Sequence, residues 1–359
     1  MDGPRAGGGG VELRRFRRLA DVTVVATFVL ILLGGIVRVT ESGLGCGPGG
    51  SGTEGWPLCG GEAIPLLSHS EVIIEFSHRF LAAVVVALIA LLAWRARRGL
   101  RELRWPFRTS IAAGVLVLIQ AGLGGLTVEK NLAEELVAAH LGLAMLLLGV
   151  TIWMSVRART ELAAAGEEIR PGRPARSSLD PVRGLKPFVS AAAVLLLCAI
   201  VAGGYVAGTE EEGVSGAGRN INGAHLACGE QFPNCLNKGP LPFGESRLSD
   251  IHLTHRAFVY AATLAILLLI GIALWRGSRS RLLALAGGLL LTQLLLGALN
   301  VWLGEHPTLV VAHLVTATLL WSTVLMIAFR LAWSPAPATA ASGLAPSAAS
   351  SPVAGAAGA

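Results

Sequence analysis

The chain has 359 residues, of which 53% are hydrophobic and only 14% are charged, and its formal net charge is +6. A soluble globular protein carries about 25% charged residues, and a disordered one combines low hydrophobicity with high net charge. The composition therefore excludes both classes and indicates a membrane protein, whose basic residues need no nucleic acid as a partner.

Eight apolar segments are each long enough to cross a bilayer as a helix, which takes about 20 predominantly apolar residues. The first follows a cluster of arginines, as a signal peptide would, but no small-residue cleavage site comes after it. We therefore expect it to be a retained helix. The predicted helices are residues 22–37, 72–94, 109–128, 132–156, 187–207, 251–275, 281–303 and 307–333.

The basic residues alternate between the two sides of these helices. Of the 29 Lys and Arg residues, 22 lie in the N-terminal segment, in the second, fourth and sixth loops, or at the C-terminal end. Cytoplasmic segments carry the excess of Lys and Arg. The pattern predicts a multi-pass protein of a bacterial-type cell membrane with both termini in the cytoplasm.

The sections between the helices suggest how the chain is divided. We expect a cytoplasmic leader over 1–20, a four-helix bundle over 21–156 and a basic cytoplasmic linker over 157–186. A second four-helix bundle follows over 187–333. The tail over 334–359 is rich in Ala, Ser, Pro and Gly, and we expect it to be disordered in the cytoplasm.

The two predicted bundles carry the same landmarks, at offsets of 169 to 177 residues. An even number of helices per repeat gives both halves the same orientation. The fold class is therefore an all-α integral membrane protein, built as two tandem four-helix bundles related by a pseudo-twofold axis along the membrane normal. The matched residues are Gly34 and Gly203, His78 and His255, Gln120 and Gln293, Gly124 and Gly297, and His140 and His313.

Four of the matched residues are histidines inside predicted membrane helices: His78, His140, His255 and His313. An ionisable residue at that depth indicates a functional site. Two imidazoles in each half suit the two axial positions of a haem, whereas a bare zinc ion takes three or four protein ligands. We predict one bis-histidine haem site per half, with packing of the four rings as the alternative.

The residues next to the first histidine of each pair extend this prediction. Arg79 and Arg256 lie at the outer membrane boundary, where a guanidinium group binds carboxylates such as haem propionates; snorkelling to the interface is the alternative. Glu75 lies one turn before His78, on the same helix face, and the second half has His252 there. We expect Glu75 to face the first haem cavity, which would make that half the reaction site; pairing with Arg79 is the alternative.

Two outer loops carry two cysteines each, Cys46 and Cys59 in the first and Cys228 and Cys235 in the third. Both loops are predicted to lie in the oxidising compartment, where a disulfide is the expected state of each pair. A structural staple and a redox role toward the haem both stay open.

These motifs together resemble the haem A synthase family over all eight helices. The resemblance implies an integral membrane oxidoreductase that oxidises the C8 methyl of haem O to the formyl group of haem A. The motifs that carry it are Thr40-Glu41-Ser42-Gly43-Leu44-Gly45-Cys46, Trp56-Pro57-Leu58-Cys59, Glu75-x-x-His78-Arg79, Ala139-His140, His255-Arg256 and Ala312-His313.

The resemblance also implies roles for residues and partners. It implies a haem b cofactor on His255 and His313, and the haem O substrate on His78 and His140. Glu75 would be the catalytic carboxylate, and the first-loop cysteines a functional pair. The implied partners are haem O synthase, cytochrome oxidase assembly factors and the lipid bilayer, and a homo-oligomer is left open.

Two other functions fit the residues alone. A di-haem b-type electron carrier linked to quinol explains the four histidines, but it gives no reason for Glu75 at one site only. A transporter also has repeats and buried ionisable groups, but it calls for broken helices near the membrane midplane, and these segments show no interruption.

Overall fold

The computed structural model describes residues 8–66, 69–166, 179–209, 223–304 and 306–333. The eight helices of these ranges are each long and apolar enough to span a membrane. The predicted all-α, eight-helix membrane fold is therefore confirmed. The helices are α1 (Gly8–Val39), α2 (Ser70–Gly99), α3 (Arg104–Glu129), α4 (Glu134–Ala164), α5 (Lys186–Gly208), α6 (Arg247–Trp275), α7 (Arg281–Trp302) and α8 (Pro307–Trp333).

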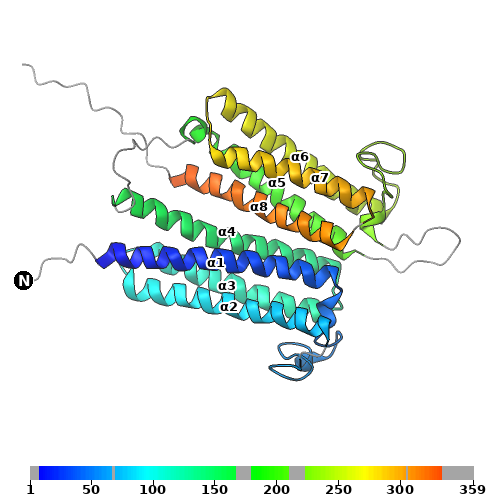
Figure 1. Cartoon of the computed structure of the whole chain (residues 1–359), viewed down its shortest axis with the longest axis horizontal. Helices are drawn as coiled ribbons and strands as arrows, with labels where there is room; N and C mark the ends of the chain where they lie inside the picture. The colour runs from blue at the N-terminus through cyan, green and yellow to red at the C-terminus, as the bar shows by residue number, and fades with distance from the viewer. Residues whose placement is uncertain (1–7, 67–68, 167–178, 210–222, 305, 334–359) are drawn as a thin grey trace, which may run out of the picture.

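The helices lie in two groups of four, as Figure 1 shows. Helices α1 to α4 pack against one another, and so do α5 to α8. The two groups meet where α4 contacts α5 and α8, and where α1 contacts α8. The pseudo-twofold relation between the groups stays a prediction.

Helix α4 joins the two groups because it buries both of its sides. Leu147, Met154 and Leu162 pack with buried residues of α1, α2 and α3. Leu148 and Ile152 pack instead with buried residues of α5 to α8. A helix that is apolar all round belongs in the interior of a bundle, and α4 takes that place.

Small residues let the two groups approach closely. A Cβ atom added to Gly149 of α4 would lie 3.1 Å from Leu325 Cδ1 of α8, and one added to Gly204 of α5 would lie 3.0 Å from Leu141 Cδ2 of α4. Nearby, Trp321 Nε1 donates to the backbone carbonyl of Met145 at 3.0 Å. In a membrane, where helices gain little from the hydrophobic effect, such close packing drives association.

Helix α1 begins at Gly8, well before the predicted start at residue 22. Its first turns bury Leu13, Phe16 and Ala20 against buried residues at the ends of α2 and α4. The arginines between these residues lower the average hydropathy, so a search for apolar runs misses this part of the helix. Residues 8–20 thus continue the first spanning helix.

Helix α4 is also longer than predicted and ends at Ala164 rather than 156. A short 3-10 helix, η3 (Asp180–Leu185), precedes α5. Residues 167–178 of the predicted linker and the tail over 334–359 fall outside the described residues.

The two cysteine loops lie at the same end of the bundle, and α1 begins and α8 ends at the opposite end (Figure 1). This arrangement agrees with an even number of crossings. Which end faces the cytoplasm stays a prediction from the distribution of charge.

Replacing Gly149 by Leu tests the junction between the groups. The added side chain would overpack a buried site, which costs about 1–3 kcal/mol, so we expect Gly149→Leu to lower the thermal unfolding temperature in detergent. Gly271→Leu is the matched control, because no atom lies within 4 Å of a Cβ at Gly271. Equal unfolding temperatures for the two variants would contradict this account of the junction.

Candidate functional site

The four predicted ligand histidines come together as two pairs, one in each group of helices. His78 of α2 lies near His140 of α4. In the same way His313 of α8 lies near His255 of α6. All four side chains are half-buried. The structure therefore brings together the residues that the sequence paired, and each pair is formed within one group of helices.

The hydrogen bond of His255 fixes which of its nitrogens is available to a ligand. Its Nδ1 lies 2.8 Å from the backbone oxygen of Ala199 on α5. A carbonyl oxygen only accepts, so Nδ1 carries the proton and Nε2 keeps its lone pair. This is the arrangement that metal-bound histidines use.

The other three histidines have a buried Nδ1 atom with no hydrogen-bond partner among the described residues. The backbone carbonyls of Leu30 and Gln120 lie near the rings of His78 and His140, but the bonds do not reach normal geometry. At His313, the Gln293 side-chain amide donates to Nε2 at 3.0 Å. One lone pair cannot both accept this bond and bind iron, so the amide would have to turn away for Nε2 to bind a haem iron.

Each pair supplies two imidazoles and no further metal ligand. In the part of the chain that the structure describes, no three His, Cys, Asp or Glu side chains gather into a group that could hold a metal ion. Two imidazoles from two helices of the same group match the number of axial ligands that a six-coordinate haem takes from its protein. The residues present therefore fit a haem in each half.

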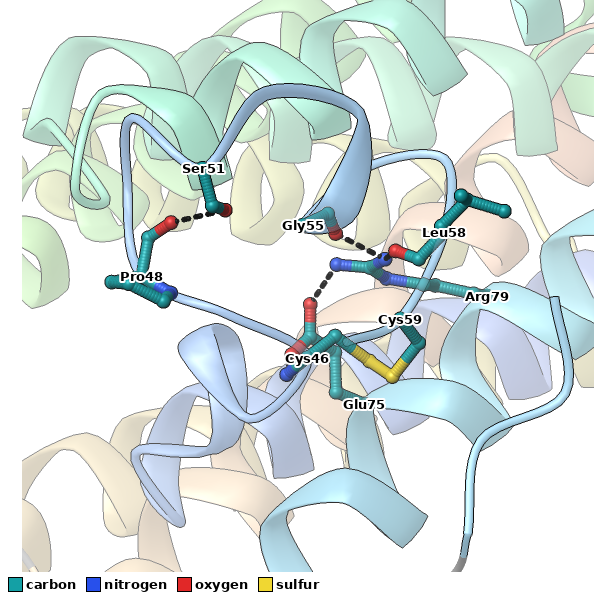
Figure 2. A network of polar contacts seen from close by, with 8 residues as sticks. All are labelled: Cys46, Pro48, Ser51, Gly55, Leu58, Cys59, Glu75 and Arg79. Carbon is teal, nitrogen blue, oxygen red and sulfur yellow. Dashed lines mark hydrogen bonds and ion pairs between the residues drawn. A yellow bond between two sulfur atoms is a disulfide. The ribbon is translucent and has the colours of Figure 1, made fainter. Parts of the chain in front are cut away.

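Glu75 is buried on α2 and points into the first outer loop, as Figure 2 shows. Its Oε2 accepts a hydrogen bond from the backbone N–H of Cys46 at 2.6 Å, and its Oε1 forms an ion pair with Arg79. The pairing with Arg79 is the alternative that the sequence left open. The carboxylate thus links the disulfide loop to the turn of helix that carries His78.

Arg79 and Arg256 hold the two cysteine loops in equivalent ways. Arg79 donates to the carbonyls of Gly55 at 2.6 Å and Leu58 at 2.7 Å (Figure 2). Arg256 donates to three carbonyls, those of Gln231, Pro233 and Asn234, at 2.9 to 3.2 Å. Propionate binding by the two arginines is not tested by these contacts and stays a prediction.

Both predicted disulfides are formed, between Cys46 and Cys59 and between Cys228 and Cys235. All four cysteines are buried. The first bridge closes a loop of 13 residues and the second a loop of 7. Each disulfide therefore closes a loop whose backbone carbonyls also accept hydrogen bonds from an arginine.

Two features of the loops were not predicted, namely a repeated sequence run and the contact made by His252. The second cysteine of each loop ends an aromatic-Pro-x-Cys run, Trp56 to Cys59 and Phe232 to Cys235, and the guanidinium of Arg256 lies over the Phe232 ring at 5.4 Å. Alignment of the two loop sequences on their second cysteines reveals this repeat.

The second feature is His252, which occupies the position that matches Glu75. Its Nδ1 donates to the backbone oxygen of Ala224 at 2.9 Å. In both halves, therefore, the side chain one turn before the first histidine binds the backbone of the outer loop. In the first half the carboxylate accepts the hydrogen bond from the loop, and in the second half the imidazole donates it to the loop.

Comparison with known proteins agrees with this arrangement. Residues 17–325 match the COX15-CtaA family, described as cytochrome oxidase assembly protein. A "Heme A synthase" of Halalkalibacterium halodurans is 28% identical over 89% of this chain and 97% of its own length. Those of Alkalihalophilus pseudofirmus and Shouchella clausii are 29% and 30% identical, over 75% and 72% of this chain and 78% and 75% of their own lengths. The chain therefore belongs to the COX15-CtaA family.

Proposed function

We propose that this chain is a haem A synthase, a multi-pass membrane oxidoreductase that converts haem O to haem A. The observation that carries the proposal is the pair of imidazoles in each half of the chain, in a protein whose relatives bear that name. The electron-carrier alternative gains no support from the relatives. The transporter alternative calls for broken helices, whereas each spanning helix here is continuous.

The second half would hold the resident haem b, on His255 and His313. The Nδ1 bond of His255 supports this assignment, because it leaves Nε2 ready to bind iron. Haem b supplies one-electron redox chemistry when it is bound. Haem O, as the substrate, would bind to His78 and His140 in the half that contains Glu75.

We propose that Glu75 transfers protons during the reaction. The conversion of a methyl to a formyl group is a four-electron oxidation that breaks carbon–hydrogen bonds and adds an oxygen atom, so protons must be transferred near the reacting carbon. A positioned carboxylate can accept such protons or stabilise positive charge that develops beside it. Glu75 is oriented by Arg79 and by the N–H of Cys46, and these contacts would hold it one turn from the substrate ligand His78.

The product would have the formyl group that distinguishes haem A from haem O. The enzyme that makes haem O and the factors that assemble cytochrome oxidase are the partners that this chemistry implies. Whether copies of the chain associate is a separate matter on which the proposal does not depend.

The ligand assignment predicts the effect of removing either imidazole of the second half. His255→Ala and His313→Ala should each purify without the Soret spectrum of a low-spin haem, because a bis-histidine iron loses one axial ligand. His306→Ala, which removes an exposed histidine at the start of α8, should keep the spectrum. Absorbance of the purified full-length protein is the measurement, and an unchanged spectrum in either ligand variant would rule out the assignment.

The role of Glu75 predicts a loss of product with retention of the resident haem. Loss of a general acid or base typically lowers a rate by about 10²–10⁴-fold, so Glu75→Gln should lower haem A formation by at least about 100-fold. The assay expresses the chain with haem O available and weighs the extracted haems.

Glu71→Gln is the matched control for this variant, because Glu71 is an exposed carboxylate one turn earlier on α2. It should form haem A at the normal rate. Haem A formation by Glu75→Gln at the rate of the control would show that Glu75 has no part in the reaction.

A further inference from the structure

Each of the four ligand histidines rests against a glycine of the preceding helix. A Cβ atom added to any of these glycines would lie 3.0 or 3.1 Å from the Cε1 atom of the ring. Carbon atoms pack best at about 3.5–4.0 Å, so only glycine leaves the ring where it is. The contacts are Gly34 to His78, Gly124 to His140, Gly203 to His255 and Gly297 to His313.

The residue four positions before each glycine explains why the contact falls there. In an α-helix the carbonyl of residue i points toward the N–H of residue i+4, so a side chain from another helix must pass residue i+4 to reach that oxygen. His255 does this, because its Nδ1 bonds to Ala199 and its ring edge lies on Gly203.

The same spacing occurs beside the other three histidines. In the first half, the carbonyls near His78 and His140 belong to Leu30 and Gln120, four residues before Gly34 and Gly124. Beside His313, Gln293 stands four residues before Gly297, and its side chain already contacts the ring. The glycine contact and the four-residue spacing therefore occur in α1, α3, α5 and α7, and a backbone carbonyl lies at the ring in the first three of these helices.

We propose that these four glycines are positioning residues for the haem ligands. Each glycine, together with the carbonyl four residues earlier, forms a histidine seat: the carbonyl accepts a hydrogen bond from Nδ1–H, and the glycine gives the ring room to lie against the helix. Nε2 is thereby turned toward the iron. This inference rests on the proposed function, and it assigns to each half residues that do not touch the iron.

An alanine in the seat should move the ring rather than unfold the helix. The Cβ atom would require the ring to give by a few tenths of an ångström, and such a shift changes the orientation of the imidazole on the iron. Loss of a group that orients a metal ligand typically lowers metal affinity about 10–100-fold.

The test compares alanine variants of the seats with control variants at glycines in two of the four seat helices. Gly203→Ala and Gly297→Ala alter the seats of the second half. Gly122→Ala in α3 and Gly288→Ala in α7 are the controls, because a Cβ at either position meets no atom within 4 Å. All four variants gain the same helix propensity, so a difference between them reports the contact with the ring.

The readouts are the EPR g-values, the midpoint potential and the retention of the resident haem in the purified full-length protein. We expect Gly203→Ala and Gly297→Ala to shift the g-values and the midpoint potential. Competition with apomyoglobin should show that their affinity for haem is lowered on the order of 10-fold. The controls should match the unmodified protein. Gly34→Ala and Gly124→Ala should leave the resident haem unchanged and weaken the binding of added haem O.

Wild-type values in both second-half variants, or equal changes in the controls, would overturn the proposal. If one glycine variant fails to accumulate, the variants of the other three seats are compared with the controls in the same way. If all four glycine variants fail while the controls accumulate, the glycines serve folding and the proposal is wrong. A wild-type protein that binds no haem would instead refute the proposed function. If the wild-type protein forms haem A and the glycine variants behave like the controls, this inference is refuted and the proposed function stands.

Discussion

An imidazole inside an apolar helix bundle has two nitrogens to satisfy and little water nearby to satisfy them. The cost of leaving a polar group unpaired there is several kcal/mol, so each ring needs a partner for Nδ1 and another for Nε2. In this chain the partner for Nδ1 is a backbone carbonyl of the preceding helix, formed at His255 and close at His78 and His140. A haem iron would be the partner for Nε2. The need for a partner at each nitrogen thus accounts both for the contact of the rings with the preceding helix and for the suitability of these histidines as haem ligands.

The outer loops are tied to the same turns of helix. Arg79 and Arg256, each next to a ligand histidine, donate to carbonyls that lie beside the second cysteine of a loop. Glu75 adds a bond to the N–H of the first cysteine, Cys46. A change in either loop would therefore act on the helix turn that carries a ligand. The two disulfides, whose four cysteines are buried, close these loops.

Much of this arrangement could be predicted from the sequence, because hydropathy and repeats report it directly. The eight helices are confirmed by the structure. It also places His78 near His140 and His313 near His255, and their role as haem ligands stays a prediction. The start of α1 could not be found in this way, because the arginines near Phe16 mask a buried face.

The contacts of the loops could not be predicted either, since they depend on where the loops fold back over the helices. Helix spacing places Glu75 on the face of His78, but it does not tell whether the carboxylate turns to the cavity or to the loop. The structure turns it to Cys46 and Arg79. In the same way, the repeated glycines were visible as landmarks such as Gly203, but their contact with a histidine ring needs the neighbouring helix.

The central claim is that each half grips one iron porphyrin between two imidazoles. Near-infrared magnetic circular dichroism of the purified full-length chain, titrated with haem until binding saturates, tests it most directly, because the charge-transfer band of a ferric haem identifies its axial ligands. The account predicts two bound haems per chain, both low-spin and both bis-histidine. Saturation at a single haem, or a second haem with a different axial ligand, would contradict it.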